Sequence, residues 1–483
     1  MLLGGALHLA KTIERKTDRP HVGVMLPTSG AFPLAVLASW LAGRVPVPVN
    51  YLLGRDDLHH VFADAEVDVV LTAGKMLEHV RENTAPDAVP DSIQTLCLEE
   101  QNFKGIPPLR WPPAPNDDDL GVLLYTSGTS GRPKGVELTH GNLDANARDA
   151  IAHAGLTRGL SFVGVLPQFH TFGLTVLTLI PLLIGAKAVY TARFVPRRLV
   201  QLIKEHQASV MVAVPSMYNA ILGVRSAEAA DLASLKLTVA GGEKLPTALR
   251  ENFRERFGIE ILEGYGLTET APVTNWATPD DPRPGSVGRS LPRVRNVILD
   301  EDLRPLATGE DGEIGIAGPN VMRGYHHLPE LTDEVIRHVP LDPDRPDATT
   351  RVFRTGDIGH LDEDGFLYIT GRKKEMLIIS GENVFPREIE EVLDRHPEVH
   401  ASAVIGQPDE SRGEVPVAYV ELCPELPEGH TLDEGAVKAF CREQMAPFKV
   451  PRAIHVLDAL PRNPTGKIMR RALVERAATT PQT

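Results

Sequence analysis

The sequence predicts an α/β protein: a large N-terminal domain of parallel-type sheets covered by helices, with a β subdomain, and a small mobile α+β C-terminal domain. The first observation behind this prediction is that strand-like and helix-like runs alternate between His21 and Leu262. The second is a change after residue 285, where short β-like runs separated by Gly and Pro predominate. The third is length, since 483 residues are too many for one ordinary domain.

The expected domain organisation follows from these changes of pattern. We expect an N-terminal domain over residues 1–371, containing the β subdomain at about 285–370, and a C-terminal domain over residues 372–483. The chain begins with one helix-like run, Met1–Arg19. No internal repeat is evident.

The alternating region is expected to contain a series of strands and helices with one long loop. Its first half predicts, in order, a strand at His21–Leu26, a helix at Phe32–Ala42, a strand at Val45–Val49, a helix carrying Leu58, Val61 and Phe62 behind Asp56 as N-cap, and a strand at Val67–Leu71. Residues 84–118, rich in Pro and Asp, predict a loop. Its second half predicts helices at Arg197–His206, Ser216–Leu222 and Pro246–Phe257, and strands at Ser209–Val214, Lys236–Ala240 and Ile259–Leu262.

The later part of the chain predicts shorter elements. They are strands at Asn296–Leu299, Glu313–Ala317, Phe366–Ile369, Ala403–Ile405 and Pro416–Glu421, a surface loop at Pro340–Pro346, a helix from Pro386 with Ile389, Val392 and Leu393 on one face, a helix at Glu434–Met445, and a frayed tail at Ala477–Thr483.

Composition excludes some classes of protein. A formal net charge of −14 argues against nucleic acid as a main partner. Cys97, Cys423 and Cys441 are widely spaced and show no disulfide or metal-ligand pattern, which suits a reducing cytoplasm. No signal peptide is expected. The apolar run Thr171–Ala186 is shorter than the roughly 20 residues of a membrane span, so we expect a buried helix there. Peripheral membrane contact and oligomeric state are left open.

A loop with the chemistry of a phosphate site follows the strand-like run Val122–Tyr125. Glycines bring backbone N–H groups close to an anion, hydroxyls add donors, and a lysine adds positive charge. The spacing is not that of the Walker A motif, and such loops are also common as plain turns. The candidate ligands are Thr126, Ser127, Gly128, Thr129, Ser130, Gly131 and Lys134.

The segment YTSGTSGRPKGV, from Tyr125 to Val136, resembles the phosphate-loop signature of the adenylate-forming superfamily, which comprises acyl-CoA synthetases, peptide-synthetase adenylation domains and luciferases. The resemblance extends over nearly the whole chain. It implies ATP and Mg²⁺ as cofactors and an activated carboxylic acid as substrate. The remaining motifs are interpreted both by their chemistry and by this resemblance.

Two segments are expected to border the acyl and nucleotide sites. His170, in a PQFHTFG segment, would by itself be interpreted as a satisfied core histidine, but the matching family histidine lies beside both sites. AGGEKLP, from Ala240 to Pro246, ends a strand and precedes a helix, the usual ligand-binding edge of an α/β sheet. The resemblance implies that Gly242 and Glu243 contact adenine through their backbone.

The YGLTET segment is the second strong signature. Tyr265 offers a flat face to a purine, with Gly266 beside it, and Thr268 offers a hydroxyl to a phosphate. Glu269 offers an oxygen ligand of the kind that Mg²⁺ prefers. A lone glutamate is usually a solvated surface charge, but the match to the family favours catalytic roles for Thr268 and Glu269, with Glu269 as the metal ligand.

The RTGD segment around Asp357 resembles the ribose-binding motif of the family. A carboxylate can accept two hydrogen bonds from a diol, although Gly-Asp pairs also form ordinary Asx turns. Arg372 follows at the family's spacing and is implied as a second ribose or phosphate contact. Lys374 matches the hinge about which the small domain turns.

Two C-terminal motifs complete the predicted site. Ser380 and Gly381, in SGEN where GGEN is commoner, match the loop that faces the thiol substrate. Lys467, in PRNPTGK, matches the catalytic lysine that also contacts the nucleotide; Asn463 stands where the pattern has threonine. A lysine near a terminus is otherwise usually a surface charge.

The resemblance implies a two-step ligase that converts a fatty acid to acyl-AMP and then to a thioester. The motifs are similar to those of long-chain fatty acyl-CoA ligases, and VNYLLG and AGGEKLP are similar to the synthetase half of bifunctional acyl-acyl-carrier-protein synthetase/acyltransferases. Coenzyme A is therefore the first expected acceptor and acyl-carrier protein the second, with a non-thiol acceptor as in luciferases a third option. A hypothesis of another class, a nucleotide-binding module without catalysis, predicts decay of the chemical residues, which are all present.

Overall fold

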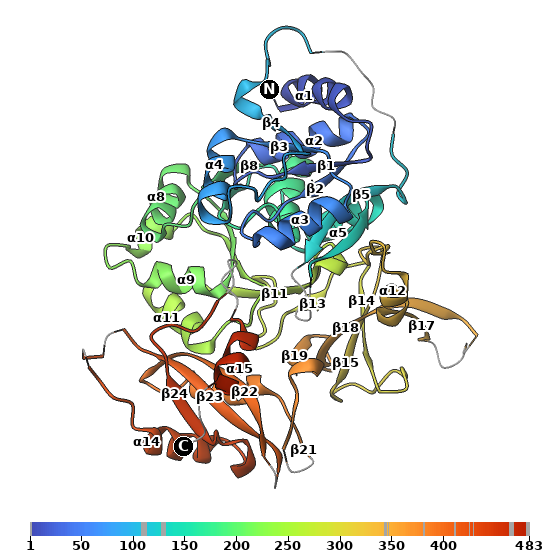
Figure 1. Cartoon of the computed structure of the whole chain (residues 1–483). Helices are drawn as coiled ribbons and strands as arrows, with labels where there is room; N and C mark the ends of the chain where they lie inside the picture. The colour runs from blue at the N-terminus through green and yellow to red at the C-terminus, as the bar shows by residue number, and fades with distance from the viewer. Residues whose placement is uncertain are drawn as a thin grey trace.

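The computed structural model describes residues 2–107, 114–126, 132–341, 345, 347–379, 382–409, 412–424, 426–427, 429–462 and 468–479. Figure 1 shows helices surrounding the sheets of the N-terminal half, an antiparallel sheet beside them, and a separate sheet with its own helices toward the C-terminus. The predicted α/β class is confirmed.

A four-stranded parallel sheet forms the N-terminal edge of the molecule. Its order is β2-β1-β3-β4, and each neighbouring pair is parallel. The strands are β1 (His21–Val24), β2 (Val45–Pro48), β3 (Val69–Thr72) and β4 (Gln94–Cys97). The helices of this region are α1 (Leu2–Lys16), α2 (Ala31–Leu41), α3 (Arg55–Asp64) and α4 (Gly74–Asn83).

A seven-stranded sheet lies beside it, in the order β13-β12-β11-β10-β9-β7-β8. The run from β8 to β11 is parallel, and β12 and β13 add antiparallel strands at one edge. The strands are β7 (Ser161–Gly164), β8 (Lys187–Tyr190), β9 (Val210–Ala213), β10 (Leu237–Ala240), β11 (Leu262–Gly266), β12 (Val273–Trp276) and β13 (Arg289–Ser290). The helices of this region are α5 (His140–His153), α6 (Thr171–Leu174), α7 (Ile180–Ile184), α8 (Pro196–His206), α9 (Pro215–Leu222), α10 (Ala229–Leu232) and α11 (Thr247–Phe257).

Helix α8 illustrates how the sequence produces these elements. Pro196 occupies the first turn, where its missing N–H has no cost, and Gln207 ends the helix in the left-handed conformation. Leu199, Leu202 and Ile203 recur at helical spacing and are buried. The amphipathic face therefore packs on the sheet while the arginines remain outside.

Two antiparallel sheets follow in the middle of the chain. A three-stranded sheet has the order β16-β6-β5, with strands β5 (Leu120–Thr126), β6 (Lys134–Thr139) and β16 (Gly324–Tyr325). A five-stranded sheet corresponds to the predicted β subdomain, with strands β14 (Arg295–Leu299), β15 (Gly312–Ala317), β17 (Ile336–Pro340), β18 (Thr349–Leu361) and β19 (Leu367–Arg372). Helix α12 (Pro329–Val335) connects β16 to β17.

The C-terminal sheet packs its own hydrophobic clusters. Its strands are β20 (Leu377–Ile379), β21 (Glu382–Val384), β22 (Val399–Asp409), β23 (Gly413–Leu422) and β24 (Ala453–Val456), and its helices are α13 (Pro386–Leu393), α14 (Glu434–Gln444) and α15 (Arg470–Thr479). Ile389, Val392 and Leu393 of α13 are buried, as their spacing predicts. The expected division of the chain at residue 371 stays a prediction; Arg372 itself is the last residue of β19.

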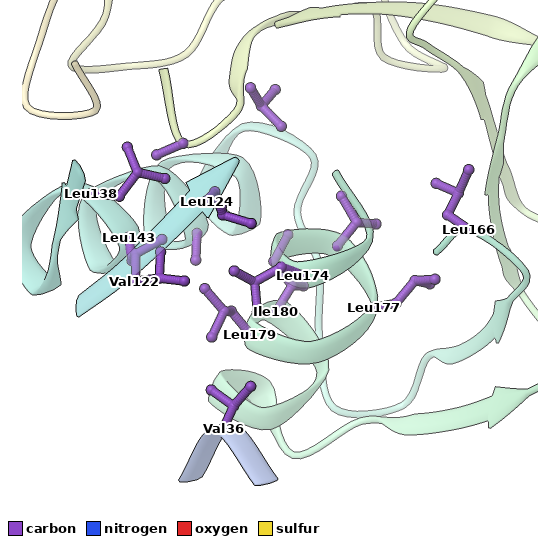
Figure 2. Packing of buried hydrophobic residues seen from close by; sticks show 14 of the residues in the cluster. Val36, Val122, Leu124, Leu138, Leu143, Leu166, Leu174, Leu177, Leu179 and Ile180 are labelled. Atoms are coloured by element: carbon purple, nitrogen blue, oxygen red, sulfur yellow. The ribbon is translucent and has the colours of Figure 1, made fainter. Parts of the chain in front are cut away.

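The large core joins the sheets through the helical segment that begins at Thr171. Figure 2 shows Leu174, Leu179 and Ile180 of this segment beside Val122 and Leu124 of β5, with Leu138 and Leu143 next to them. A π-helical turn, Thr175–Leu179, separates α6 from α7. Such turns occur often at functional sites.

Several sequence-based expectations were wrong in detail. The predicted loop 84–118 contains β4, because Leu96 and Cys97 extend the parallel sheet beside β3. Asp56 is not the N-cap of α3, since Gly54 takes that position and Asp56 lies in the first turn. The predicted strand Ile259–Leu262 lies further along the chain. It is β11, which begins at Leu262 and runs to Gly266, because it pairs with β10 and β12.

Two apolar or terminal segments also differ from expectation. The predicted buried helix Thr171–Ala186 is not buried throughout: Leu182 and Leu183 are 39% and 44% exposed, because α7 ends at the surface at Gly185. The predicted frayed tail includes the last turn of α15, which continues to Thr479; Leu473, on the same helix, packs in a buried cluster. Within the described residues, no helix is long and apolar enough to cross a membrane.

Candidate active site

A hairpin of β5 and β6 holds the two ends of the predicted phosphate loop. Thr126 pairs with Lys134 in the antiparallel register, so the described ends of the loop face each other. The Lys134 Nζ lies 5.8 Å from the ring centroid of Tyr325. The predicted ligands Ser127, Gly128, Thr129, Ser130 and Gly131 lie outside the described residues.

A pocket opens near the carboxyl ends of the parallel strands β9, β10 and β11. It encloses about 550 Å³, counting the space at its open mouth. Its lining combines glycines and polar groups with apolar side chains, and the two kinds adjoin each other, since the Phe172 ring lies against Gly241. The glycines and polar residues are His170, Gly241, Gly242, Gly264, Tyr265, Gly266 and Thr268; the apolar residues are Phe172, Val176, Val212, Val239, Leu267, Pro272, Val273 and Trp276.

His170 lines this pocket as the N-cap of α6. Its Nδ1 accepts a hydrogen bond of 3.4 Å from the Phe172 backbone N–H. The residue is exposed, so the alternative in which His170 is a core histidine is wrong. His170 therefore presents an exposed imidazole to the pocket, beside the apolar ring of Phe172.

Glycine is required at two positions of the pocket wall. Gly242 has a φ of 84°, in the left-handed region that L side chains rarely adopt. A Cβ at Gly266 would lie 2.0 Å from the carbonyl oxygen of Pro272. Backbone therefore forms these walls directly, and a flat, hydrogen-bonding group such as a purine could approach it with the Tyr265 ring nearby. Glu243 adjoins Gly242, but its side chain is not part of the pocket lining.

A buried carboxylate links Tyr265, on β11, to the antiparallel sheet. The Tyr265 hydroxyl donates a 2.6 Å hydrogen bond to Oδ2 of Asp357, and Arg372 Nε lies 3.0 Å from Oδ1. Asp357 is 3% exposed and pairs with Arg372 across β18 and β19. Burial, together with the charge of Asp357, raises the pKa of Tyr265 well above its usual value. Each carboxylate oxygen retains a lone pair, so a ribose diol can still be accepted.

Glu269 provides the carboxylate expected to bind a metal. Its Oε1 accepts a 2.8 Å hydrogen bond from the hydroxyl of Tyr325. Burial raises the pKa of Glu269, and among the described residues no lysine or arginine forms an ion pair with it. A divalent cation would supply the missing positive charge, so the residues present fit Mg²⁺. Thr268 precedes it in the pocket wall.

Sequence reasoning missed the residues that hold this segment from behind. The Asn146 side chain donates to the carbonyl groups of Thr270 and Val273, at 3.3 and 2.6 Å, and accepts from the Val273 N–H. Asn320 donates to the same carbonyl of Thr270 at 3.0 Å. For Asn146 the sequence offered one indication, which is a polar residue on the buried face of α5. It offered no indication for Tyr325 and Asn320, because their hydrogen-bond partners are distant in sequence.

The AGGEKLP segment also contacts the C-terminal sheet. Lys244 forms an ion pair with Glu391 of α13, and Asn219 of α9 lies 3.0 Å from the His400 ring nitrogen. Figure 1 shows α9 and α11 facing the C-terminal unit. Arg387 is partly buried at the same place, with its Nε 3.5 Å from Oε1 of Glu391. These contacts seat α13 against the segment whose Gly241 and Gly242 line the pocket.

The structure describes the predicted hinge residue but not the predicted residues of the two C-terminal motifs. Lys374 lies in the 3₁₀ turn Lys373–Glu375, where the chain passes from β19 to the C-terminal sheet. Ser380, Gly381 and Lys467 lie outside the described residues. Arg470, three residues after Lys467, is bound by Glu375 at 3.1 Å and by Glu390 at 2.7 Å.

The sequence matches two family profiles. One, described as AMP-binding enzyme, covers residues 3–326, and the other, described as AMP-binding enzyme C-terminal domain, covers residues 388–467. The chain belongs to the AMP-binding enzyme family. The expected relationship to acyl-CoA synthetases is confirmed, and use of ATP follows from membership.

Curated relatives of this AMP-binding enzyme act on different acids. A long-chain-fatty-acid–CoA ligase of Bacillus subtilis (strain 168) is 32% identical, covering 98% of this chain and 89% of the relative. A sulfoacetate–CoA ligase of Cupriavidus necator is 34% identical, covering 94% and 87%. A feruloyl-CoA synthase of Amycolatopsis is 32% identical, covering 96% and 90%.

Solved structures agree with the fold over the whole chain. The ATP-bound crystal structure of MatB from Rhodopseudomonas palustris is 29% identical, with a TM-score of 0.85, covering 99% of this chain and 93% of that one. The o-succinylbenzoate-CoA synthetase MenE of Bacillus subtilis, in complex with ATP and magnesium ion, is 28% identical, with a TM-score of 0.82, covering 98% and 93%.

The Tyr325 hydroxyl should control the metal dependence of this enzyme. We expect Tyr325→Phe to raise the Mg²⁺ concentration needed for half-maximal ATP–pyrophosphate exchange by roughly 10- to 100-fold, because the side chain that orients Glu269 is lost. The measurement is the exchange rate against Mg²⁺ at saturating ATP and acid. Tyr368→Phe, on a ring that stacks with His360, is the control and should leave the curve unchanged. An unaltered curve for Tyr325→Phe would contradict the orienting role.

Proposed function

We propose that this enzyme is an AMP-forming ligase that activates a fatty acid, chiefly a long-chain one, and transfers the acyl group to the thiol of coenzyme A. The observation that carries the proposal is the pocket itself, in which Tyr265 and Thr268, next to Asp357 and Glu269, line one cavity together with apolar side chains. One cleft can therefore hold a nucleotide phosphate beside an acyl chain.

In the first step, a carboxylate oxygen attacks the α-phosphorus of ATP, the bond to the β-phosphate oxygen breaks, and acyl-AMP and pyrophosphate result. The protein mainly positions the reactants and stabilises charge. Asp357 and Arg372 would hold the ribose, Gly242 and Glu243 would contact adenine, and Tyr265 with Gly266 would cover it. Mg²⁺, when bound, neutralises charge on the phosphates.

The loops on either side would stabilise the negative charge on the phosphates and on the carboxylate. The segment from Thr126 to Lys134 would bind the β- and γ-phosphates, Thr268 would donate to a phosphate, and His170 would move aside for the carboxylate. Lys467 would bridge the carboxylate and the α-phosphate. Arg470 supports this placement of Lys467, because it pairs with Glu375, in the turn directly after Arg372, and is attracted electrostatically by Glu243.

In the second step, the thiol sulfur attacks the acyl carbon, AMP leaves with the bonding electrons, and the thiol proton is released. The proposal assigns the thiol side to Ser380 and Gly381, which would replace the Lys467 loop after rotation at Lys374. Coenzyme A is the first acceptor proposed. Acyl-carrier protein, whose phosphopantetheine presents the same thiol, is the second.

The apolar side chains of the pocket favour an uncharged chain. They are valines, Phe172, Leu267, Pro272 and Trp276, and the lining formed by described residues includes no lysine or arginine to pair with a second anionic group. Burying an unpaired sulfonate there would be costly. This argues for a fatty acid, as used by the Bacillus ligase, over sulfoacetate.

A second candidate substrate is a hydroxylated aromatic acid. Trp276 is 3% exposed, lines the pocket, and its indole N–H has no hydrogen-bond partner among the described residues. Buried donors usually have a partner, and a phenolic or methoxy oxygen would provide one where a plain alkyl chain cannot. The feruloyl-CoA synthase among the relatives acts on an acid of this kind.

A substrate panel tests the proposal. Pyrophosphate release is measured with ATP, Mg²⁺ and each of a series of fatty acids, a hydroxycinnamic acid or sulfoacetate, with coenzyme A, with acyl-carrier protein, or with neither. We expect release to be greatest with a fatty acid and to yield its coenzyme A thioester. Greater release with the hydroxycinnamic acid would favour the second candidate. No acid-dependent release under any condition would favour the non-catalytic nucleotide-binding module.

The Lys467 assignment predicts separate effects on the two steps. We expect Lys467→Ala to lower the rate of acyl-AMP formation on the order of 10²- to 10³-fold, because an electrostatic contact to the transition state is lost. Conversion of supplied acyl-AMP to thioester should be retained. Lys236→Ala, on an exposed lysine, is the control. Equal loss in both steps would contradict this assignment.

The hinge assignment predicts the reverse separation. We expect Lys374→Pro to retain acid-dependent pyrophosphate release and to lose thioester formation, since proline fixes φ at the turn between the two sheets. Lys374→Ala removes the charge but keeps the backbone freedom, and should support both steps. Full thioester activity in Lys374→Pro, measured in single turnovers, would show that the domain does not turn at this residue.

A further inference from the structure

A histidine pair lies next to the active-site wall without taking part in it. His326 and His327 follow β16 directly, and Asp64 ends α3. One donor atom from each of these three residues lies within 4.8 Å of the others. Two imidazoles and one carboxylate form a ligand set typical of divalent first-row transition metals.

The backbone at the histidine pair adopts an unusual conformation. The Leu328 N–H donates to the Tyr325 carbonyl at 3.1 Å and closes a turn over the two histidines. His327 has a φ of 56°, a value that such turns normally reserve for glycine or asparagine. The centroids of the two rings lie 3.8 Å apart, with their planes tilted by 31°. Strain of this kind occurs often at functional sites and places both imidazoles beside Asp64.

Two neighbouring side chains orient the ligands from outside. Glu137 Oε1 lies 2.7 Å from Nδ1 of His326, and the Asp64 backbone also accepts a hydrogen bond from this ring, so a metal ion that binds Nε2 would replace that second hydrogen bond. The Tyr125 hydroxyl donates at 2.6 Å to Oδ2 of Asp64, which leaves Oδ1 directed toward His327, whose Nδ1 lies 3.6 Å away. Ligating histidines commonly have a carboxylate on the other ring nitrogen, and ligating carboxylates are themselves hydrogen-bonded. The surroundings therefore have the second layer of a metal site.

The cluster is also accessible and adaptable. The side chains of His326 and Asp64 are 11% and 24% exposed, whereas that of His327 is 60% exposed. Ligand atoms around zinc lie about 3.3 Å apart for bonds of about 2.0–2.1 Å, so the cluster has to contract modestly at the exposed His327. A metal can enter from this side, and water can complete its coordination.

We propose that His326, His327 and Asp64 bind one divalent transition metal ion of the zinc class, which ties the end of α3 to the segment after β16. This site is separate from the Mg²⁺ ligand Glu269, and the inference does not depend on the proposed ligase activity. Among the described residues, no other histidine-containing group of this kind is found.

Cobalt spectroscopy on the full chain tests the proposal. The protein is stripped with chelator, returned to buffer with excess Mg²⁺ so that oxygen-rich sites are filled, and titrated with Co²⁺ without ATP. We expect one equivalent to produce the visible absorption of a low-coordinate imidazole site, which Zn²⁺ then displaces. Zn²⁺ should also raise the midpoint of thermal unfolding, because it binds only the folded chain.

Matched variants identify the ligands. His327→Gly removes an imidazole while glycine accepts the positive φ, so the turn is retained; we expect it to weaken Co²⁺ binding on the order of 100-fold or more and to abolish the thermal shift. Asp64→Asn should act in the same direction. His430→Ala, on a histidine paired with Glu398 and outside this cluster, is the control. Absence of the cobalt spectrum, or an unchanged spectrum in His327→Gly, would overturn the proposal; the former would identify a protonated histidine paired with carboxylates.

Discussion

The buried carboxylate of Asp357 is the constraint on which the arrangement of the site depends. A charge that is removed from water must be paired, and here a guanidinium and a phenol from two different strands supply the pairing. Arg372 lies opposite Asp357 in the antiparallel register, whereas Tyr265 comes from the last parallel strand of the seven-stranded sheet. The interaction therefore joins two sheets beside the pocket, and losing either partner would leave a buried charge.

The same interaction limits how the pocket can move. Arg372 ends β19, and the next residues form the turn that leads to the C-terminal sheet. The proposed ribose ligands Asp357 and Arg372 thus belong to the fixed side of the predicted hinge, whereas α13, with Glu391 on Lys244, belongs to the side that would turn. A rotation at Lys374 would break the contacts of α13 and leave the buried pair of Asp357 intact. Breaking the contacts of α13 costs less free energy than breaking the buried pair would.

How much the sequence could predict depended on whether the determining contacts were local. The strand-turn-helix order around Gly242 carries its own turn residues and was predicted correctly, and so was the strand before the loop that begins at Thr126. The second strand of that hairpin, β6, was not predicted. The strand β4 was not predicted either, because its pairing with β3 overrides the Pro- and Asp-rich composition around it. Site positions were inferred from motifs, but Tyr325 and Asn146 belong to no motif, since each acts on the YGLTET segment across a long sequence separation.

The hairpin of β5 and β6 has two faces, because side chains alternate along its strands. One face carries apolar core residues, and the other carries Glu137, which contacts the histidine pair. Val136 and Leu138 face the large core, on the side of Lys134, whereas Glu137 lies on the other face. Tyr125 packs with the α3 side, and Leu124 with the large core. The histidine pair also adjoins the candidate metal ligand through β16, because Tyr325 directly precedes His326 and its hydroxyl donates to Glu269. A cation on the histidine pair would therefore act on Glu269 through the position of Tyr325, and on the described ends of the loop through the register of the hairpin, set by Thr126 opposite Lys134.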